Sequence, residues 1–210
     1  MGLRKAISDQ MYQAGPARYY QPAYARIAAE FGESAGTFID LGCGPGWVAV
    51  RLGEQYPEST VIGIDHSQEM IRAASKNGAH LGNVRFIRAE GAETGLASSS
   101  VRAVIAVQTV HHWSAPGEIL SEASRVVAPG GRLVVLEADR SAHRVPAGWI
   151  QQTARGWPPD FMVTLGWRRF GMDDAEWADL CGLAAGAGFT KQRQRRFGFY
   201  RCLEAEIDGG

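Results

Sequence analysis

Short apolar runs alternate with helical patterns along residues 37–137, and this alternation constrains the fold more than any other feature. The runs have the length and β-branched content of strands, and they occupy residues 37–41, 60–64, 84–87, 101–107 and 133–136. The helical patterns between them cover residues 47–55, 68–76 and 116–127. Strands joined by helices in this rhythm predict βαβ units. They therefore indicate an α/β fold with a parallel sheet covered on both faces.

The segments on either side of this core differ from it in composition. Residues 1–36 look helical and contain Tyr12, Tyr19, Tyr20 and Tyr24. Residues 141–172 contain Trp149, Trp157 and Trp167, and linkers are seldom so aromatic. We interpret this second segment as an insertion that serves either as a lid over an apolar ligand or as additional core. Residues 174–207 predict a helix that ends before Gly188, then two strands that turn near Gly198.

Composition and charge argue against several classes of protein. Lys plus Arg equals Asp plus Glu, at 22 each, whereas a nucleic-acid-binding protein more often has a basic surplus. Cys43, Cys181 and Cys202 are far apart and form no C-x-x-C pair, so the sequence predicts neither a disulfide framework nor a metal site. The first residues are polar, and no apolar run approaches the ~18 residues of a membrane span. We expect a cytoplasmic protein that binds no membrane, and nucleic acid is not its expected partner.

A glycine-rich loop follows the first apolar run. Residues 39–46 read Ile-Asp-Leu-Gly-Cys-Gly-Pro-Gly, and a helical pattern begins directly after them. Glycine is needed where the backbone turns tightly or touches a ligand, and the N-terminus of the next helix suits an anion. Asp65 ends the second run, where its carboxylate can accept hydrogen bonds from both ribose hydroxyls. This combination predicts a site for a nucleotide-containing cofactor.

The residue at position 47 separates two kinds of cofactor. In the dinucleotide fingerprint G-x-G-x-x-G the third glycine packs the helix closely against the strand. That position is occupied by Trp47, whose indole opposes such packing. An NAD-binding oxidoreductase is therefore the weaker interpretation.

Four motifs, in order, resemble class I S-adenosylmethionine (SAM) dependent methyltransferases, specifically the small-molecule branch called type 11. Residues 38–46 resemble the first motif, and residues 61–67 followed by Met70 resemble the acidic second motif. Val110-His111-His112-Trp113 follows the fourth run, as in similar members, and residues 122–133 resemble the family's helix, Pro-Gly-Gly turn and fifth strand. The resemblance covers about residues 36–138. It implies a doubly wound, seven-stranded, mostly parallel Rossmann-like sheet with an aromatic-rich insertion after the fifth strand.

The resemblance also implies a single domain with four parts. These are an N-terminal helical cap (1–36), a cofactor-binding core (37–138), a substrate-side insertion (141–172) and a C-terminal helix with two strands (174–207).

Individual residues receive cofactor-binding roles from the same resemblance. The loop residues Gly42, Cys43, Gly44 and Gly46 would lie against the methionine part of SAM. Asp40 and the Gln108 carbonyl would lie near its ammonium group, Asp65 would hold the ribose, and His66 would lie along the adenine. Members usually have Gly-Asp-Ala-Glu after the third strand, where this chain reads Ala89-Glu90-Gly91-Ala92-Glu93. We assign the adenine contact there to Glu90, beside Gly91.

The remaining polar motifs each leave two interpretations open. His111 and His112 are candidate catalytic residues because a neutral imidazole can take a proton from a hydroxyl. The favoured alternative is that they only line or brace the pocket. Lys191, Arg193, Arg195 and Arg196 could form an RNA-binding face, but a solvated sheet edge is favoured.

The predicted function is transfer of a methyl group from SAM to an oxygen, nitrogen or carbon of a small molecule, partly apolar or aromatic. A non-catalytic SAM-binding subunit and an RNA methyltransferase remain alternatives. The sequence leaves the acceptor and the oligomeric state open.

Overall fold

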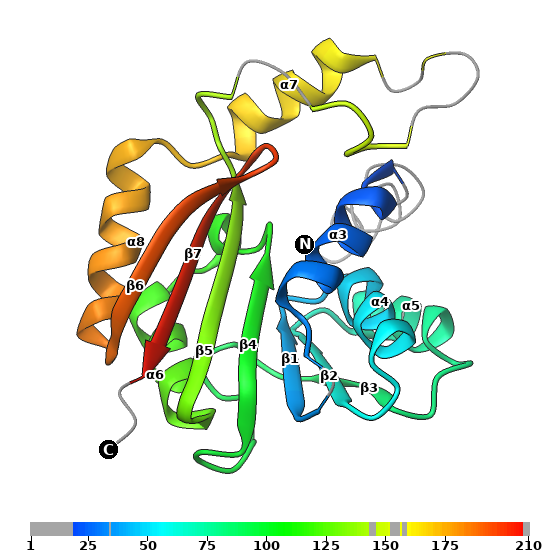
Figure 1. Cartoon of the computed structure of the whole chain (residues 1–210), viewed down its shortest axis with the longest axis vertical. Helices are drawn as coiled ribbons and strands as arrows, with labels where there is room; N and C mark the ends of the chain where they lie inside the picture. Colours follow the sequence, from blue (N-terminus) through cyan, green and yellow to red (C-terminus); the bar gives the residue numbers. More distant parts are fainter. Residues whose placement is uncertain (1–18, 34, 143–145, 152–155, 157–158, 208–210) are drawn as a thin grey trace.

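The computed structural model describes residues 19–33, 35–142, 146–151, 156 and 159–207. Its centre is a seven-stranded sheet with the order β3-β2-β1-β4-β5-β7-β6 (Figure 1). The strands are β1 (Thr37–Leu41), β2 (Thr60–Asp65), β3 (Val84–Arg88), β4 (Val101–Val107), β5 (Val127–Ala138), β6 (Phe189–Phe197) and β7 (Tyr200–Ile207). Strands β1 to β5 pair in parallel, and β7 pairs antiparallel with both β5 and β6. The predicted seven-stranded, mostly parallel sheet is confirmed.

Helices cover both faces of the sheet. One face carries α3 (Gln21–Phe31), α4 (Trp47–Gln55) and α5 (Gln68–Asn77), and the other carries α6 (Pro116–Val126) and α8 (Asp174–Gly186) (Figure 1). The strands carry apolar side chains on both faces of the sheet. For example, the neighbouring β5 residues Val134 and Val135 are fully buried in different core clusters. The doubly wound architecture follows from this two-sided burial.

The order of the strands determines where a ligand can bind. The chain reverses direction across the sheet between β1 and β4, and open α/β sheets bind ligands outside the carboxyl ends of such strands. The short helix η1 (Val110–His112) follows β4 at this edge. Helix α7 (Asp160–Phe170) lies beyond the ends of β4 and β5 (Figure 1).

Strand β5 begins earlier than the sequence predicts. We expected helix 116–127 to end at the Pro-Gly-Gly turn and the strand to begin after it. In the structure α6 ends at Val126, and Val127 already pairs with Val101 of β4. The register then shifts, and Ala103 pairs with Arg132, so the Pro-Gly-Gly segment is an irregularity inside β5. Burial of Val127 in the core favours strand over helix at this position.

The insertion contributes both core and exposed surface. The Trp149 ring packs edge-on against Phe197 and Phe199 at the tip of the β6–β7 hairpin, with ring centroids 5.0 and 5.9 Å apart. Gly198 has a φ of +64°, and a Cβ there would lie 2.6 Å from the indole of Trp149. This end of the insertion is therefore additional core. In contrast, α7, which the sequence analysis did not predict, exposes Phe161 and Leu165. Residues 1–18 and Trp157, which also entered the predictions, lie outside the described residues.

We expect Glu122→Gln to destabilise the protein near neutral pH by about 1–2 kcal/mol, a value reduced for solvent screening because the Arg125 side chain is 40% exposed. Hydrogen bonds from Arg125, together with the Thr94 hydroxyl and N–H, lower the pKa of Glu122 to about 2. A carboxyl with a lowered pKa stabilises the fold above its unfolded value of 4.5, and this stabilisation is lost as the pH falls toward 2. Urea unfolding at about pH 7 and about pH 3 measures the difference. A penalty of equal size at both pH values would contradict the ionic contribution.

Candidate active site at the carboxyl edge of the sheet

The glycine loop connects β1 to α4 at the carboxyl edge. Gly42, Gly44 and Gly46 have φ angles of +70°, +52° and +82°, a left-handed conformation that favours glycine. A Cβ on Gly42 would lie 2.0 Å from the Thr109 hydroxyl, and one on Gly46 would lie 2.7 Å from the Phe86 ring. At Gly44 a Cβ would meet nothing within 4 Å. Two of the glycines thus serve packing, whereas Gly44 borders open space where a ligand can touch the backbone.

Asp65, at the end of β2, is hydrogen-bonded to this loop. One carboxylate oxygen accepts the N–H of Gly44 at 2.9 Å, and the other accepts the N–H of Ser67 at 2.8 Å. These bonds fix the orientation of the carboxylate beside the open face of Gly44. Each oxygen retains capacity to accept further hydrogen bonds, which is what ribose hydroxyls require.

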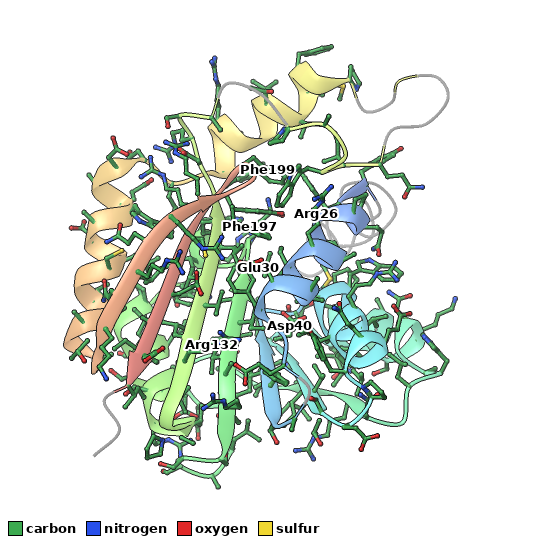
Figure 2. The ribbon with its side chains drawn as sticks, viewed as in Figure 1. Arg26, Glu30, Asp40, Arg132, Phe197 and Phe199 are labelled. Atoms are coloured by element: carbon green, nitrogen blue, oxygen red, sulfur yellow. The ribbon has the colours of Figure 1, made fainter. Side chains whose placement is uncertain are left out.

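Asp40 is a buried carboxylate directly below the loop, on β1 and facing α4 (Figure 2). Burial raises its pKa from 3.8 to about 7, opposed by the hydrogen bond from the N–H of Ala49 and reinforced by the charge of Asp65. Two carboxylates near one loop favour a cationic ligand group, because a cation would relieve both the burial and the repulsion.

We expected the N-terminus of α4 to take an anionic group, and a carboxylate of the protein itself contacts this terminus. The N–H of Ala49, in its first turn, donates to the Asp40 carboxylate at 3.0 Å, and the N–H of Gly46 donates to the Cys43 carbonyl. The protein's own carboxylate therefore occupies part of this anion-binding position. A cationic group fits better beside Asp40 than an anionic one.

Cys43 donates a weak hydrogen bond from its thiol to the Gly44 carbonyl, with Sγ and O 3.6 Å apart. Its side chain is buried with Ile71 and Ala74, and its N–H donates to the carbonyl of Ile64. Burial raises the pKa of the Cys43 thiol well above its usual range, so the thiol stays protonated. This environment does not suit a nucleophile.

Gln108 directly follows β4 and has a strained backbone conformation. Its φ is +51°, one of two positive values among the described non-glycine residues, and its N–H donates to the carbonyl of Leu136. Strain of this kind costs roughly 1–3 kcal/mol and often marks a ligand site. Thr109, which the sequence analysis did not identify, lies next to it, and its side chain fills the space beside Gly42.

The candidate adenine contacts lie farther along the same edge. Ala89 donates its N–H to the carbonyl of Asp65, which places Glu90 and Gly91 just past the end of β3. Gly91 lies against Ile119 of α6, and the side chain of Glu90 is exposed. His66 is half-exposed, with Nδ1 3.7 Å from Asp65. All three residues border the edge, and their roles stay predictions.

A cavity of about 550 Å³ lies between η1, the end of α7 and α8. Its wall is mostly apolar and includes Phe170, Met172 and Leu183. His111 and His112 both line it, with ring centroids 4.0 Å apart. Its charged lining is balanced, since Arg140 and Arg169 line it together with Glu176 and Asp179, and Arg140 pairs with Glu176. The structure thus brings both candidate catalytic histidines to a cavity that the predicted insertion helps to form.

Glu137, near the end of β5, is a site residue that the sequence analysis missed. Its side chain is fully buried, and its two oxygens contact the N–H of Val110 at 2.6 Å and Nδ1 of His111 at 3.2 Å. A glutamate inside an apolar run was the available signal, since a carboxylate buried among Val and Leu requires partners.

The basic run at the C-terminus lies on β6, the outermost strand of the sheet. Arg195 pairs with Glu30 and Glu204, and Arg196 pairs with Asp139. These contacts agree with the sheet-edge interpretation. Among the residues that the structure describes, no group of three or more His, Cys, Asp or Glu could hold a metal ion, and no helix is long and apolar enough to cross a membrane.

The sheet order, the glycine loop and Asp65 together define a Rossmann-like domain for a nucleotide-containing ligand. Comparisons with known proteins identify the family. The sequence model of the methyltransferase domain matches residues 39–135. A ubiquinone/menaquinone biosynthesis C-methyltransferase of Syntrophotalea carbinolica is 32% identical over 69% of this chain and 61% of its own length. A malonyl-[acyl-carrier protein] O-methyltransferase of Hahella chejuensis is 34% identical over 52% of this chain and 42% of its own length.

A solved structure supports the fold over nearly the whole chain. A SAM-dependent methyltransferase from Aquifex aeolicus superposes with a TM-score of 0.64 at 23% identity, over 90% of this chain and 91% of that one. The chain belongs to the class I SAM-dependent methyltransferases, in the type 11 branch that the resemblance indicated. It spans less than two thirds of the length of the curated relatives named above.

Proposed function

We propose that this protein transfers a methyl group from SAM to a small molecule bound in the cavity beside η1. The observation that carries the proposal is a pair of interacting carboxylates at the glycine loop: Asp65 accepts the N–H of Gly44, and the buried Asp40 accepts the N–H of Ala49 and is influenced by the charge of Asp65. SAM carries an ammonium group and a ribose, and these two groups match the two carboxylates. In this assignment residues 37–138 bind the cofactor, and residues 141–172 contribute to the acceptor side.

The residues at the carboxyl edge fit SAM. Asp40 and the Gln108 carbonyl would hold the ammonium group, Gly42, Cys43, Gly44 and Gly46 would lie along the methionine part, and Asp65 would hold the ribose. His66, Glu90 and Gly91 would border the adenine. When bound, SAM supplies a methyl group on a positively charged sulfur, which is already activated for transfer.

The protein's own contribution is to position the acceptor and exclude water. The apolar cavity wall suits a small acceptor with an apolar or aromatic part. His111 and His112 would contact the acceptor there. The cytoplasmic location and the absence of nucleic acid as a partner remain predictions.

Thermal melting with SAM, its product S-adenosylhomocysteine (SAH) and NAD tests the cofactor assignment. At about 100 times the dissociation constant, selective binding to the folded state contributes about 2.7 kcal/mol. For a chain of this size we expect a rise in Tm of about 5–10 °C with SAM and SAH. NAD should produce no shift, because Trp47 replaces the third glycine of the dinucleotide loop. A shift with NAD alone, or no shift with either sulfur compound, would refute the proposed function.

Two alternatives make different predictions. A non-catalytic SAM-binding subunit would show the same shift but methylate none of a broad set of acceptors. An RNA methyltransferase would bind RNA with a steep dependence on salt concentration. The pairing of Arg195 and Arg196 with carboxylates leaves less free positive charge for that second alternative.

A further inference from the structure

Glu137 and His111 form a buried contact that the binding of SAM does not require. Glu137 is 0% exposed, and one of its oxygens is held by the N–H of Val110 at 2.6 Å. The other oxygen lies 3.2 Å from Nδ1 of His111, whose side chain is 21% exposed. The imidazole thus lies between a buried carboxylate and the cavity that it lines.

The contact determines which nitrogen of His111 carries the proton. A carboxylate only accepts hydrogen bonds, so Nδ1 must be the protonated nitrogen. In the neutral ring Nε2 then has a free lone pair. Because Nδ1 faces Glu137, Nε2 is the nitrogen available to a molecule in the cavity. The tilted rings of His112 and Phe170, with centroids 4.0 and 5.9 Å away, restrict rotation of the imidazole.

We propose that His111 is a general base, that Glu137 is its positioning residue, and that the methyl acceptor is therefore the hydroxyl of a phenol or enol. This inference rests on the proposed function, since it requires SAM as the donor. Such a hydroxyl is mostly protonated near neutral pH, as in tyrosine with a pKa of about 10, and its oxygen becomes a strong nucleophile only when the proton leaves. An amine acceptor that binds as a free base has no such need before transfer.

The step balances without any other reactant. The hydroxyl proton moves to Nε2 of His111, and the oxygen lone pair forms the bond to the methyl carbon. The bond between that carbon and the sulfur breaks, and its electron pair stays on sulfur, so that SAM becomes SAH. The protonated His111 is stabilised by the Glu137 carboxylate and later loses its proton to water.

Glu137→Gln tests the positioning role, because it should preserve the fold and reverse the tautomer. The Gln carbonyl can still accept the N–H of Val110, and its amide NH₂ then faces Nδ1 as a donor. Nδ1 must accept, so Nε2 carries the proton and cannot act as a base. Nitrogen-15 NMR should show His111 protonated at Nδ1 in the wild type and at Nε2 in the variant. Protonation of the neutral wild-type ring at Nε2 would refute the dyad.

Two phenols distinguish a general base from a residue that only supports the local structure. At about pH 8, 4-methoxyphenol is protonated, whereas 4-nitrophenol is largely ionised without help. We expect Glu137→Gln and His111→Ala to reduce kcat/KM for 4-methoxyphenol by about 10²- to 10⁴-fold, the usual contribution of a general base. The loss for 4-nitrophenol should be less than about tenfold, because no proton has to be removed. The matched control is Glu122→Gln. Glu122 is a buried carboxylate on α6 that does not line the cavity, so this variant should methylate both phenols as the wild type does.

Every outcome decides the proposal. Equal losses with both phenols would mean that His111 and Glu137 only support the local structure, and the base assignment would be wrong. Wild-type protein that binds SAM in the melting experiment but methylates neither phenol would refute the acceptor class. Protein that fails to bind SAM would instead refute the proposed function itself.

Discussion

Gly44→Ala should weaken SAM binding by about 5- to 150-fold, while Gly130→Ala leaves it unchanged. A Cβ at Gly44 meets no protein atom within 4 Å. We place the methionine part of SAM in this open space. The added methyl group would collide with the ligand and not with the protein. An overpacked contact costs about 1–3 kcal/mol, which corresponds to this range of affinity.

Gly130 is a matched control for backbone strain. Its φ is +71°, compared with +52° at Gly44, and a Cβ there also meets nothing within 4 Å. Gly130 lies in the first part of β5, at the opposite edge of the sheet from the glycine loop. Both alanine variants should therefore lose about 1–2 kcal/mol of stability, the cost of left-handed backbone for a residue with a Cβ.

Isothermal titration with SAM and urea unfolding of both variants separate the two effects. Equal SAM affinity in Gly44→Ala and Gly130→Ala would place the cofactor elsewhere. A stability loss in Gly44→Ala far larger than that in Gly130→Ala would mean that the loop needs this glycine for folding and not for binding.

The sequence predicted the elements whose signals are local. The glycine loop, Asp65 and the first five strands could be placed because a strand, a turn and a helix each leave a pattern within a few residues. The α7 helix was missed because residues 160–170 follow two prolines inside a segment that we interpreted only by its aromatic content. The start of β5 was misplaced because its pairing with Val101 overrides the helical pattern that continues through Val127.

The contacts between distant residues could not be predicted in the same way. Glu137 lies 26 residues from His111 in the sequence, and only the parallel pairing of β4 with β5 brings them together. Likewise, Asp40 was expected near the ligand's ammonium group. Its bond to the N–H of Ala49 follows from the packing of α4 on β1, and no motif indicates it. Local patterns therefore predicted the candidate site, whereas tertiary packing sets the hydrogen bonds and burial of its acidic and basic groups.

Asp40→Asn should stabilise the ligand-free protein at about pH 8 by on the order of 4 kcal/mol and weaken its binding of SAM. Burial raises the pKa of Asp40 to about 7, so the folded state retains a proton that the unfolded chain loses above 3.8. Stability therefore falls as the pH rises from about 4 to about 7, and it stays low above that range. Asparagine is neutral at every pH, and its carbonyl can still accept the N–H of Ala49. The gain should shrink toward about pH 4, where folded and unfolded wild-type chains are both largely protonated at this position.

The same substitution should remove the charge that attracts the ammonium group. A hydrogen bond to a charged partner is worth about 1.5–3 kcal/mol, so SAM affinity at about pH 8 should fall about 10- to 150-fold. Wild-type affinity should also decrease as the pH falls below about 7, since protonation of Asp40 cancels its charge, and this dependence should be absent in the variant. Urea unfolding and titration calorimetry at about pH 5 and pH 8 measure both effects. In the unfolding experiment Glu122→Gln should change the free energy of unfolding in the opposite direction. The Glu122 carboxyl has a lowered pKa, so its neutralisation destabilises the folded protein. A stability gain in Asp40→Asn without loss of SAM affinity would show that the burial of Asp40 serves the fold and not the cofactor.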